Sequence, residues 1–178
     1  FKQKTAYEIM PSLVGSEMCI RDRYFTCTRT LFVALSCKVY SRGAISMDIR
    51  RIDPEEARQL LDSQDGYTYL DVRSEEEFAQ GHVPGSVNIP VATSNPMGPG
   101  LVPNPEFTSQ VEEQFEKDSR IITACLRGGR SLKAAMMLIA GGYTEIVDMQ
   151  GGYDAELDAF GNVIVEGWAR RGFPTTTD

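Results

Sequence analysis

Cys125 is the side chain in this sequence best suited to nucleophilic chemistry. It opens the segment Cys125-Leu126-Arg127-Gly128-Gly129-Arg130-Ser131, and it is the one cysteine between residues 47 and 178. Since it has no partner within that stretch, it cannot form a disulfide there, which fits a reducing compartment. A solitary cysteine is also the arrangement expected of a catalytic thiol, so the residues around it decide its role.

The position of Cys125 between two expected elements favours an anion at its sulfur. A β-type run at residues 120–124 leads directly into the cysteine, and a helical pattern follows at residues 131–140. A strand, a tight loop and a helix place a nucleophile at the carboxyl end of a strand, where α/β sheets bind ligands. Loop N–H groups and the positive end of the helix dipole stabilise negative charge there. The Cys125 thiolate can be that charge.

Two arginines and two glycines accompany the cysteine. Arg127 and Arg130 are candidate cations beside a thiolate. Gly128 and Gly129 allow the positive φ values or the close backbone approach that a short loop needs. The alternative is an inert thiol that ends a buried strand, with the glycines as a plain connector and the arginines on the surface. Because all four residues lie within five positions of a lone cysteine, we favour a nucleophilic role for Cys125 over an inert thiol.

Strands and helices alternate along the rest of the chain. We expect strands at residues 67–72, 86–91, 120–124 and 145–149, and helices that begin at Pro54, span 74–80, begin at Asn104–Pro105 and span 131–140. Residues 92–103 are expected to be a long Pro/Gly-rich loop, and Trp168 and Phe173 a terminal clasp over the core or the active loop. This alternation predicts an α/β fold with a mostly parallel central sheet and helices on both faces.

Other polar residues have structural explanations. Glu75, Glu76 and Glu77 occupy an expected first helical turn, where acids favour the positive helix end and face solvent, so we assign them no chemistry. His82 is the sole histidine, and a general base is not needed when the thiol is already ionised. With one histidine and no metal-ligand spacing, we expect neither a metal nor another cofactor.

Two motifs resemble the rhodanese family of sulfurtransferases. The first comprises Leu70-Asp71-Val72-Arg73, Glu77-Phe78, Gly81-His82-Val83-Pro84-Gly85-Ser86 and Asn88-Ile89-Pro90. The second is the Cys125 loop, with Ala134-Ala135 on the next helix and Gly151-Gly152-Tyr153 beyond it. The resemblance spans residues 48–174 and implies one rhodanese-like domain.

The resemblance implies sulfur transfer by covalent catalysis. Cys125 would take a sulfane sulfur from a donor such as thiosulfate, hold it as a persulfide and pass it to cyanide or a thiol. Arg130 would close the loop and stabilise the anionic sulfur. The substrate-binding loop would be completed by Leu126, Arg127, Gly128, Gly129 and Ser131.

The resemblance also assigns supporting roles near this loop. Asp71 and Arg73 are expected beside it, where Asp71 accepts hydrogen bonds from the loop arginines or pairs with Arg73 to hold the loop. Leu126 stands where the family frequently has arginine. A neutral side chain there reduces the attraction for a dianion such as thiosulfate, so a low-molecular-weight persulfide or a protein persulfide is the alternative donor.

Two further functions stay open. Related phosphatases and arsenate reductases have one more residue between the cysteine and the final arginine, whereas Arg130 is five positions after Cys125. The shorter loop favours sulfur over oxyanion chemistry. A persulfide relay or binding module for a protein partner is the other alternative, motivated by Leu126 and by the long loop at residues 92–103.

Composition excludes two classes of partner. The net charge of −7 is unevenly distributed. Residues 1–46 are basic, with seven Lys and Arg against three Asp and Glu, whereas residues 47–178 are acidic, with eleven Lys and Arg against twenty-two Asp and Glu. An acidic body argues against nucleic acid, whose binding needs Lys and Arg on phosphates. No apolar run approaches the roughly 20 residues that a membrane span needs. We therefore expect small sulfur donors and acceptors, or proteins that carry them.

Residues 1–46 are predicted to lie outside the domain. Residues 2–23 resemble the translation of a sequencing-library adapter and are excluded from fold prediction. Residues 24–46 contain three basic residues and no acid, as a presequence or a translated leader would. Met47 is the expected native start, which gives a domain of residues 47–178. We expect a cytoplasmic location, or a mitochondrial or plastid one if residues 24–46 are a genuine presequence.

Overall fold

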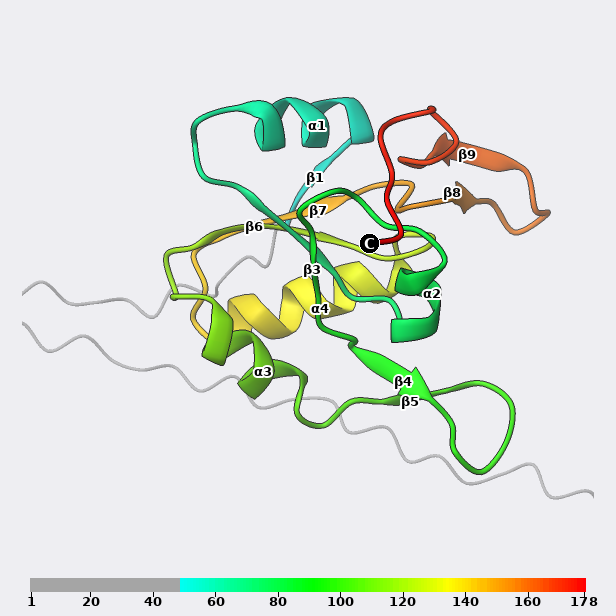
Figure 1. Cartoon of the computed structure of the whole chain (residues 1–178), viewed down its shortest axis with the longest axis horizontal. Coiled ribbons are helices and arrows are strands. Elements are labelled where there is room, and N and C mark those ends of the chain that lie inside the picture. Colours follow the sequence, from blue (N-terminus) through cyan, green and yellow to red (C-terminus); the bar gives the residue numbers. More distant parts are fainter. Residues whose placement is uncertain (1–48) are drawn as a thin grey trace, which may run out of the picture. The chain divides into compact units, whose positions relative to one another are not determined.

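A parallel sheet of five strands organises residues 49–178, the part of the chain that the computed structural model describes (Figure 1). The strand order is β1-β7-β6-β2-β3, and every neighbouring pair is parallel. The elements are β1 (Arg50–Ile52), α1 (Pro54–Asp62), β2 (Thr68–Asp71), α2 (Glu75–Ala79), β3 (Val87–Asn88), β4 (Ala92–Ser94), β5 (Leu101–Pro103), α3 (Phe107–Gln114), β6 (Arg120–Ala124), α4 (Gly129–Ala140), β7 (Glu145–Met149), β8 (Ala155–Leu157) and β9 (Val163–Glu166). The predictions for residues 1–46 and for Met47 lie outside the described residues.

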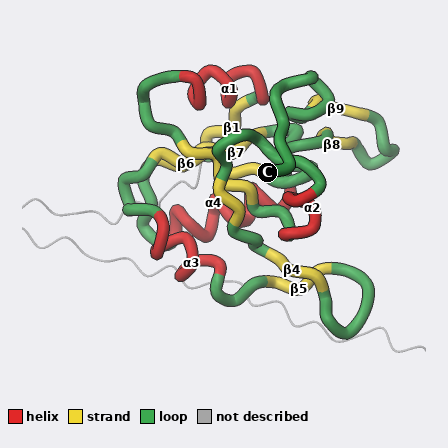
Figure 2. The backbone as a smooth tube through the Cα atoms, in the orientation of Figure 1, coloured by secondary structure: helices red, strands yellow, loops and turns green. Residues whose placement is uncertain are grey.

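Helices cover both faces of the sheet, as predicted. On one face, α3 and α4 contribute Phe107, Val111 and Leu138 to a buried cluster that includes Cys125. On the other face, α1 packs Ala57 into a second cluster with Ile122. Figure 2 shows α1 on one side of the strands and α3 and α4 on the other. Residues 121–124 of β6 are buried, which explains their mainly apolar sequence, and the one polar side chain, Thr123, donates its hydroxyl to the Val147 carbonyl at 3.3 Å.

Side-chain caps fix where two of the helices begin. The Asp53 carboxylate accepts a hydrogen bond from the Glu56 backbone N–H at 2.8 Å, directly before Pro54 at the first helical position. Ser74 and Glu77 form a capping box at the start of α2. Both starts agree with the sequence prediction.

Several element boundaries differ from prediction. The expected strand at 86–91 reduces to Val87–Asn88. The Ile89 and Val91 N–H groups still donate to the Asp71 and Val72 carbonyls, at 3.1 and 3.2 Å, but successive partner carbonyls do not have the two-residue spacing of a regular parallel ladder. Helix α3 begins at Phe107, since the Asn104 side chain accepts from the Glu106 N–H and makes a turn first. Helix α4 begins at Gly129, two residues before the expected start. Strand β1 was not predicted.

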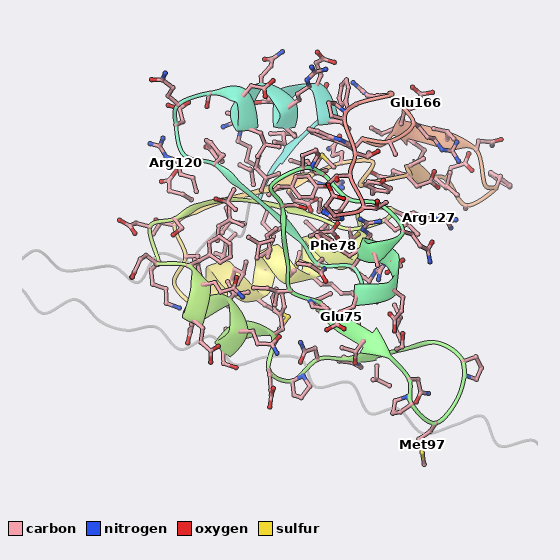
Figure 3. The ribbon with its side chains drawn as sticks, viewed as in Figure 1. Glu75, Phe78, Met97, Arg120, Arg127 and Glu166 are labelled. Atoms are coloured by element: carbon pink, nitrogen blue, oxygen red, sulfur yellow. The ribbon has the colours of Figure 1, made fainter. Side chains whose placement is uncertain are left out.

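The predicted loop at residues 92–103 is an antiparallel hairpin. β4 and β5 pair with Ala92 opposite Pro103, and the Asn95 N–H donates to the Gly100 carbonyl at 2.9 Å. Pro96, Gly98, Pro99 and Gly100 therefore form the turn of this hairpin, whereas Pro103 belongs to β5; the tip carries the exposed Met97 (Figure 3). The expectation that residues 92–103 form a single long loop is wrong, because six of them form two paired strands.

The C-terminal clasp packs on the core. The Trp168 ring meets the edge of Tyr69 at 6.0 Å between centroids and that of Phe173 at 5.1 Å. Its indole N–H donates to the Pro174 carbonyl at 2.7 Å. Trp168 belongs to the cluster beneath α1, so this clasp closes the sheet face opposite α4.

Trp168→Ala should destabilise the domain because it removes a buried aromatic side chain and leaves a cavity. We expect a loss of about 3–5 kcal/mol in the free energy of unfolding, measured by urea denaturation. Phe160→Ala is the matched control, since Phe160 is 91% exposed, and it should change stability by less than about 0.5 kcal/mol. Equal effects of the two substitutions would contradict the packing described.

Candidate active site

Cys125 lies at the carboxyl end of β6 with its sulfur directed to the start of α4. The side chain is buried, the thiol is free, and its Sγ accepts a hydrogen bond from the Gly128 N–H at 3.1 Å. Gly128 is the N-cap of α4 and has a φ of 87°, in the left-handed region. A residue with a Cβ is strained there, so the loop needs glycine at this position.

The other loop residues take different positions. Gly129 has no positive φ, and a Cβ built on it would lie in open space. The positive φ expected for the loop glycines is therefore found at Gly128 and not at Gly129. The Ser131 hydroxyl is buried and donates to the Gly128 carbonyl at 3.1 Å. Leu126 is half-buried at the mouth, whereas Arg127 is exposed and points outward (Figure 3).

A turn after β7 holds the backbone of the loop. The Tyr153 N–H donates to the Cys125 carbonyl at 2.7 Å, and the Asp154 N–H donates to the Leu126 carbonyl at 3.0 Å. A Cβ on Gly152 would lie 2.3 Å from the Cys125 carbonyl oxygen, closer than real contacts allow. Gly152 therefore lets the turn approach the loop closely enough for both hydrogen bonds.

Arg130 is paired with Glu77, a residue to which sequence patterns assign no chemistry. The guanidinium donates two hydrogen bonds, at 2.6 and 2.8 Å, to the two carboxylate oxygens. Burial raises the pKa of Glu77, but hydrogen bonds from Arg130 and from the Ser74 N–H outweigh it and leave that pKa below its usual value. The Glu77 hydrogen bond in turn raises the pKa of Arg130. The expectation of a purely solvated Glu77 is wrong.

The capping box is the signal that could have identified Glu77. The box turns this carboxylate back to accept from the Ser74 N–H at 3.1 Å, which keeps it at the start of α2 and facing the loop arginine. Glu75 and Glu76 are exposed on the same turn, as predicted.

Asp71 and Arg73 form a buried ion pair beneath the mouth of the site. The guanidinium donates to the carboxylate at 2.6 to 3.0 Å and to the backbone carbonyls of Glu77 and Gly81 at 3.2 and 2.8 Å. It also lies 4.1 Å from the centroid of the Tyr153 ring. The hydrogen bonds to the Asp71 carboxylate come from Arg73 and not from Arg127 or Arg130. The expectation of bonds from the loop arginines is therefore wrong, and the alternative of an Asp71–Arg73 pair describes the contact.

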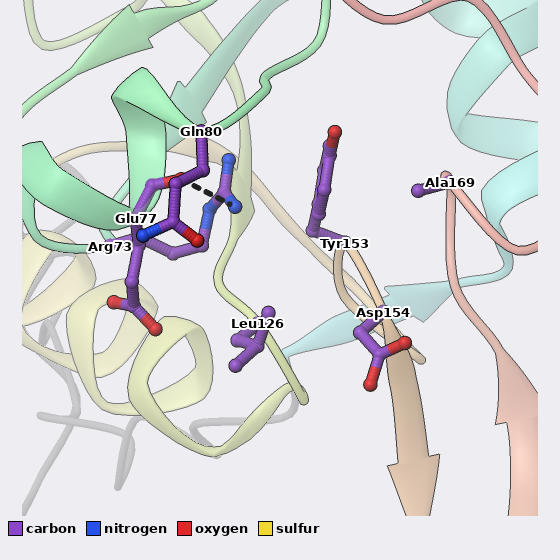
Figure 4. Close-up of a pocket in the computed structure, with 7 residues that line it drawn as sticks. All are labelled: Arg73, Glu77, Gln80, Leu126, Tyr153, Asp154 and Ala169. Carbon is purple, nitrogen blue, oxygen red and sulfur yellow. Dashed lines mark hydrogen bonds between the residues drawn. The ribbon is translucent and has the colours of Figure 1, made fainter.

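A pocket of about 420 Å³ opens beside the loop. Figure 4 shows Arg73, Glu77 and Gln80 on one side, Tyr153, Asp154 and Ala169 on the other, and Leu126 between them. The imidazole of His82 is not in this lining; it stacks on Phe78 at 3.8 Å between centroids and contacts the Phe78 carbonyl at 3.1 Å.

Within residues 49–178, no cluster of His, Cys, Asp and Glu has the arrangement of a metal site. Over that same range, every helix is too short or too polar to cross a membrane.

Glu77→Gln should reduce stability in a pH-dependent way. Because the folded-state pKa of Glu77 is depressed, its contribution is fully present above the ordinary value of 4.5 and is lost as pH falls through the folded pKa. We expect the variant to be less stable than wild type by roughly 1 kcal/mol at pH 7, and this gap to narrow below pH 4.5. Urea unfolding at several pH values measures this difference in stability. Glu75→Gln is the control, because it removes another carboxylate charge from the same helix start, and its effect is subtracted from that of Glu77→Gln. A gap that widens on acidification would contradict the pairing.

Comparison with known proteins identifies relatives of this domain. A sequence profile described as "Rhodanese-like domain" matches residues 53–158. The chain is 41% identical over 110 residues to "Thiosulfate sulfurtransferase 16, chloroplastic" of Arabidopsis thaliana, covering 62% of this chain and 80% of that protein. It is also 41% identical over 112 residues to "Protein HIGH ARSENIC CONTENT 1, mitochondrial" of the same plant, covering 63% and 64%.

A solved structure agrees with these relatives. The crystal structure of Rv0390 from M. tuberculosis superposes with a TM-score of 0.60 at 25% identity, over 72% of this chain and 97% of that one. With the sequence profile matching more than half of the chain, the conclusion is that this protein belongs to the rhodanese-like domain family.

Proposed function

We propose that this protein is a sulfurtransferase that carries sulfane sulfur as a persulfide on Cys125. The observation that supports this most is the Cys125 sulfur at the end of β6, facing the start of α4 and accepting the Gly128 N–H at 3.1 Å. A hydrogen bond to sulfur and a helix N-terminus both favour an anion, which is the reactive form of a thiol and the resting form of a persulfide. The relative named thiosulfate sulfurtransferase supports the same chemistry.

The reaction divides into two nucleophilic displacements. The Cys125 thiolate attacks the outer sulfur of thiosulfate, a sulfur–sulfur bond forms, and the bond to the sulfonate sulfur breaks with its electron pair leaving on sulfite. Cyanide or an acceptor thiolate then attacks the terminal sulfur of the persulfide. The bond to Cys125 breaks, which returns the thiolate and releases thiocyanate or a new persulfide.

The charges around the pocket favour a donor of lower charge than thiosulfate. Arg73 is paired with Asp71, Arg130 is paired with Glu77, and Asp154 accepts from Arg170 at 2.7 Å. These cations are therefore neutralised by partners within the domain, and Leu126 adds an apolar surface. An organic persulfide, free or carried by a protein, suits this lining better than a dianion.

The family relatives bear on the remaining alternatives. The name of one relative, "HIGH ARSENIC CONTENT 1", states no reaction, and the short spacing from Cys125 to Arg130 favours sulfur transfer over arsenate reduction. The two relatives' names place them in a chloroplast and a mitochondrion, which favours an organelle for this protein over the cytoplasm.

Turnover by the full chain and by Cys125→Ser tests the proposal. The full chain should convert a persulfide donor, or thiosulfate, and cyanide to thiocyanate, and Cys125→Ser should lose at least about 100-fold in rate, because the hydroxyl is not ionised. Cys37→Ser is the matched control and should retain activity. Cys125-dependent arsenate reduction without thiocyanate formation would replace the sulfurtransferase with the arsenate reductase. Thiocyanate formation that survives in Cys125→Ser would refute it.

Leu126→Arg should shift donor preference toward thiosulfate. An added unpaired cation at the pocket should raise kcat/KM for thiosulfate by roughly fivefold at low salt, and the gain should shrink as salt rises. The value for cysteine persulfide, which carries less charge, should rise by less. Leu126→Met is the control for changed shape without changed charge. Equal gains for both donors would show that charge at residue 126 does not set the preference.

A further inference from the structure

Gly128, which donates the hydrogen bond to the Cys125 sulfur, is supported by residues outside the pocket. Its carbonyl accepts from the Ser131 hydroxyl at 3.1 Å. A Cβ built on Gly128 would lie 3.4 Å from Nη2 of Arg51, so this guanidinium occupies the side of Gly128 toward which a side chain would project. Arg51 comes from β1, far from the loop in sequence, and neither motif of the family resemblance includes it.

Arg51 is held in place by a buried carboxylate. Its Nε donates to Asp148 Oδ2 at 3.0 Å, and its Nη2 lies 3.5 Å from Glu156 Oε2. The Asp148 side chain has no solvent-exposed area. The pairing follows from the parallel register of the sheet, in which Arg51 stands opposite Asp148. One end of this ion pair therefore lies in the sheet and the other against the loop.

Asp148 also connects to the first turn of α4. Burial raises the pKa of Asp148, while the nearby Ser131 hydroxyl and the Arg51 guanidinium act in the opposite direction. The Thr123 hydroxyl lies 3.5 Å from the Asp148 carboxylate. A buried carboxylate is costly unless it is paired and hydrogen-bonded. Arg51, which pairs with Asp148, and Ser131, which lies near it, also flank Gly128.

We propose that Arg51 and Asp148, acting with Ser131, are positioning residues that hold the Gly128 N–H on the Cys125 sulfur. Arg51 limits the movement of Gly128 on one side, and Ser131 fixes its carbonyl on the other. The orientation of the N–H toward sulfur follows from both. The inference deepens the proposed function, on which its catalytic meaning rests, but the hydrogen bond itself can be tested without sulfur transfer.

The rate at which iodoacetamide alkylates Cys125 measures the effect of this hydrogen bond. The thiolate attacks carbon and iodide leaves, so the rate near pH 7 follows the stabilisation of the thiolate. At about pH 10, where ordinary thiols are ionised, the rate reflects access alone. Since the full chain has four cysteines, modification is followed at Cys125 by mass spectrometry of its peptide.

Arg51→Gln in the full chain should slow Cys125 alkylation at pH 7 by about three- to tenfold, the effect of weakening one hydrogen bond to a charged group. The rate at pH 10 should match wild type, and Arg51→Lys should recover at least half of the rate at pH 7. Arg50→Gln is the matched control, because Arg50 lies next in β1, is exposed and pairs with Glu56 instead. It should leave the rate unchanged.

A wild-type rate for folded Arg51→Gln at pH 7 would overturn the proposal, and so would equal slowing at pH 7 and pH 10, which indicates altered access. If circular dichroism shows that Arg51→Gln does not fold, Ser131→Ala decides, since alanine is well tolerated in a helix. It should slow alkylation about threefold at pH 7 and not at pH 10, as expected for loss of a single hydrogen bond. A wild-type rate in that variant would also overturn the proposal. If the wild-type chain forms no thiocyanate while the alkylation rates of the variants change as expected, the proposed function fails and the positioning role of Arg51 stands.

Discussion

The hydrogen bond from the Gly128 N–H to the Cys125 sulfur is the contact on which the rest of the site depends. It requires β6 to end at Ala124 and α4 to begin at Gly129, so the chain must reverse within the few residues between them. A reversal this short needs a left-handed residue, and Gly128 supplies it. The sulfur then faces the helix N-terminus, where negative charge is stabilised.

Segments distant in sequence hold this loop in place. The turn after β7 donates two backbone hydrogen bonds to the loop carbonyls, and Gly152 permits that approach. Glu77 at the start of α2 pairs with Arg130 at the start of α4. The loop is thus fixed at its backbone and at its final arginine. Because each contact crosses between elements, packing of the whole sheet is needed to form the site.

The pairing of charges has a functional consequence. Sequence patterns suggest several cations around a thiolate, but Arg130 and Arg73 are each neutralised by a carboxylate, and Arg127 lies at the surface. Under the proposed function, an anionic sulfur would then be stabilised by the Gly128 N–H and the helix dipole more than by free guanidinium groups. The proposed persulfide would suit a site of this kind, which would attract a dianionic donor only weakly.

The strands that place Cys125 could be predicted from sequence because their signals are local. β6 and β7 agree with prediction to the residue, and the helix caps at Asp53 and Ser74 mark their helices correctly. Strand β1 was missed because it has only three residues, and the β4–β5 hairpin was missed because its segment is rich in turn-forming residues. The Asp71–Arg73 pair, two residues apart, is one of the two sequence expectations for Asp71. The Arg130–Glu77 pair joins α4 to α2. The capping box indicates that Glu77 is held at the start of its helix, but spacing along the chain does not indicate which arginine it meets.

The mass of the Cys125 peptide after sulfur loading tests the central claim most directly. The full chain is incubated with thiosulfate or cysteine persulfide, freed of excess donor and digested without reductant. The peptide that contains Cys125 should gain the mass of one sulfur atom, and cyanide should remove it. Sulfur found only on Cys19, Cys27 or Cys37, or no gain with either donor, would contradict a persulfide at Cys125.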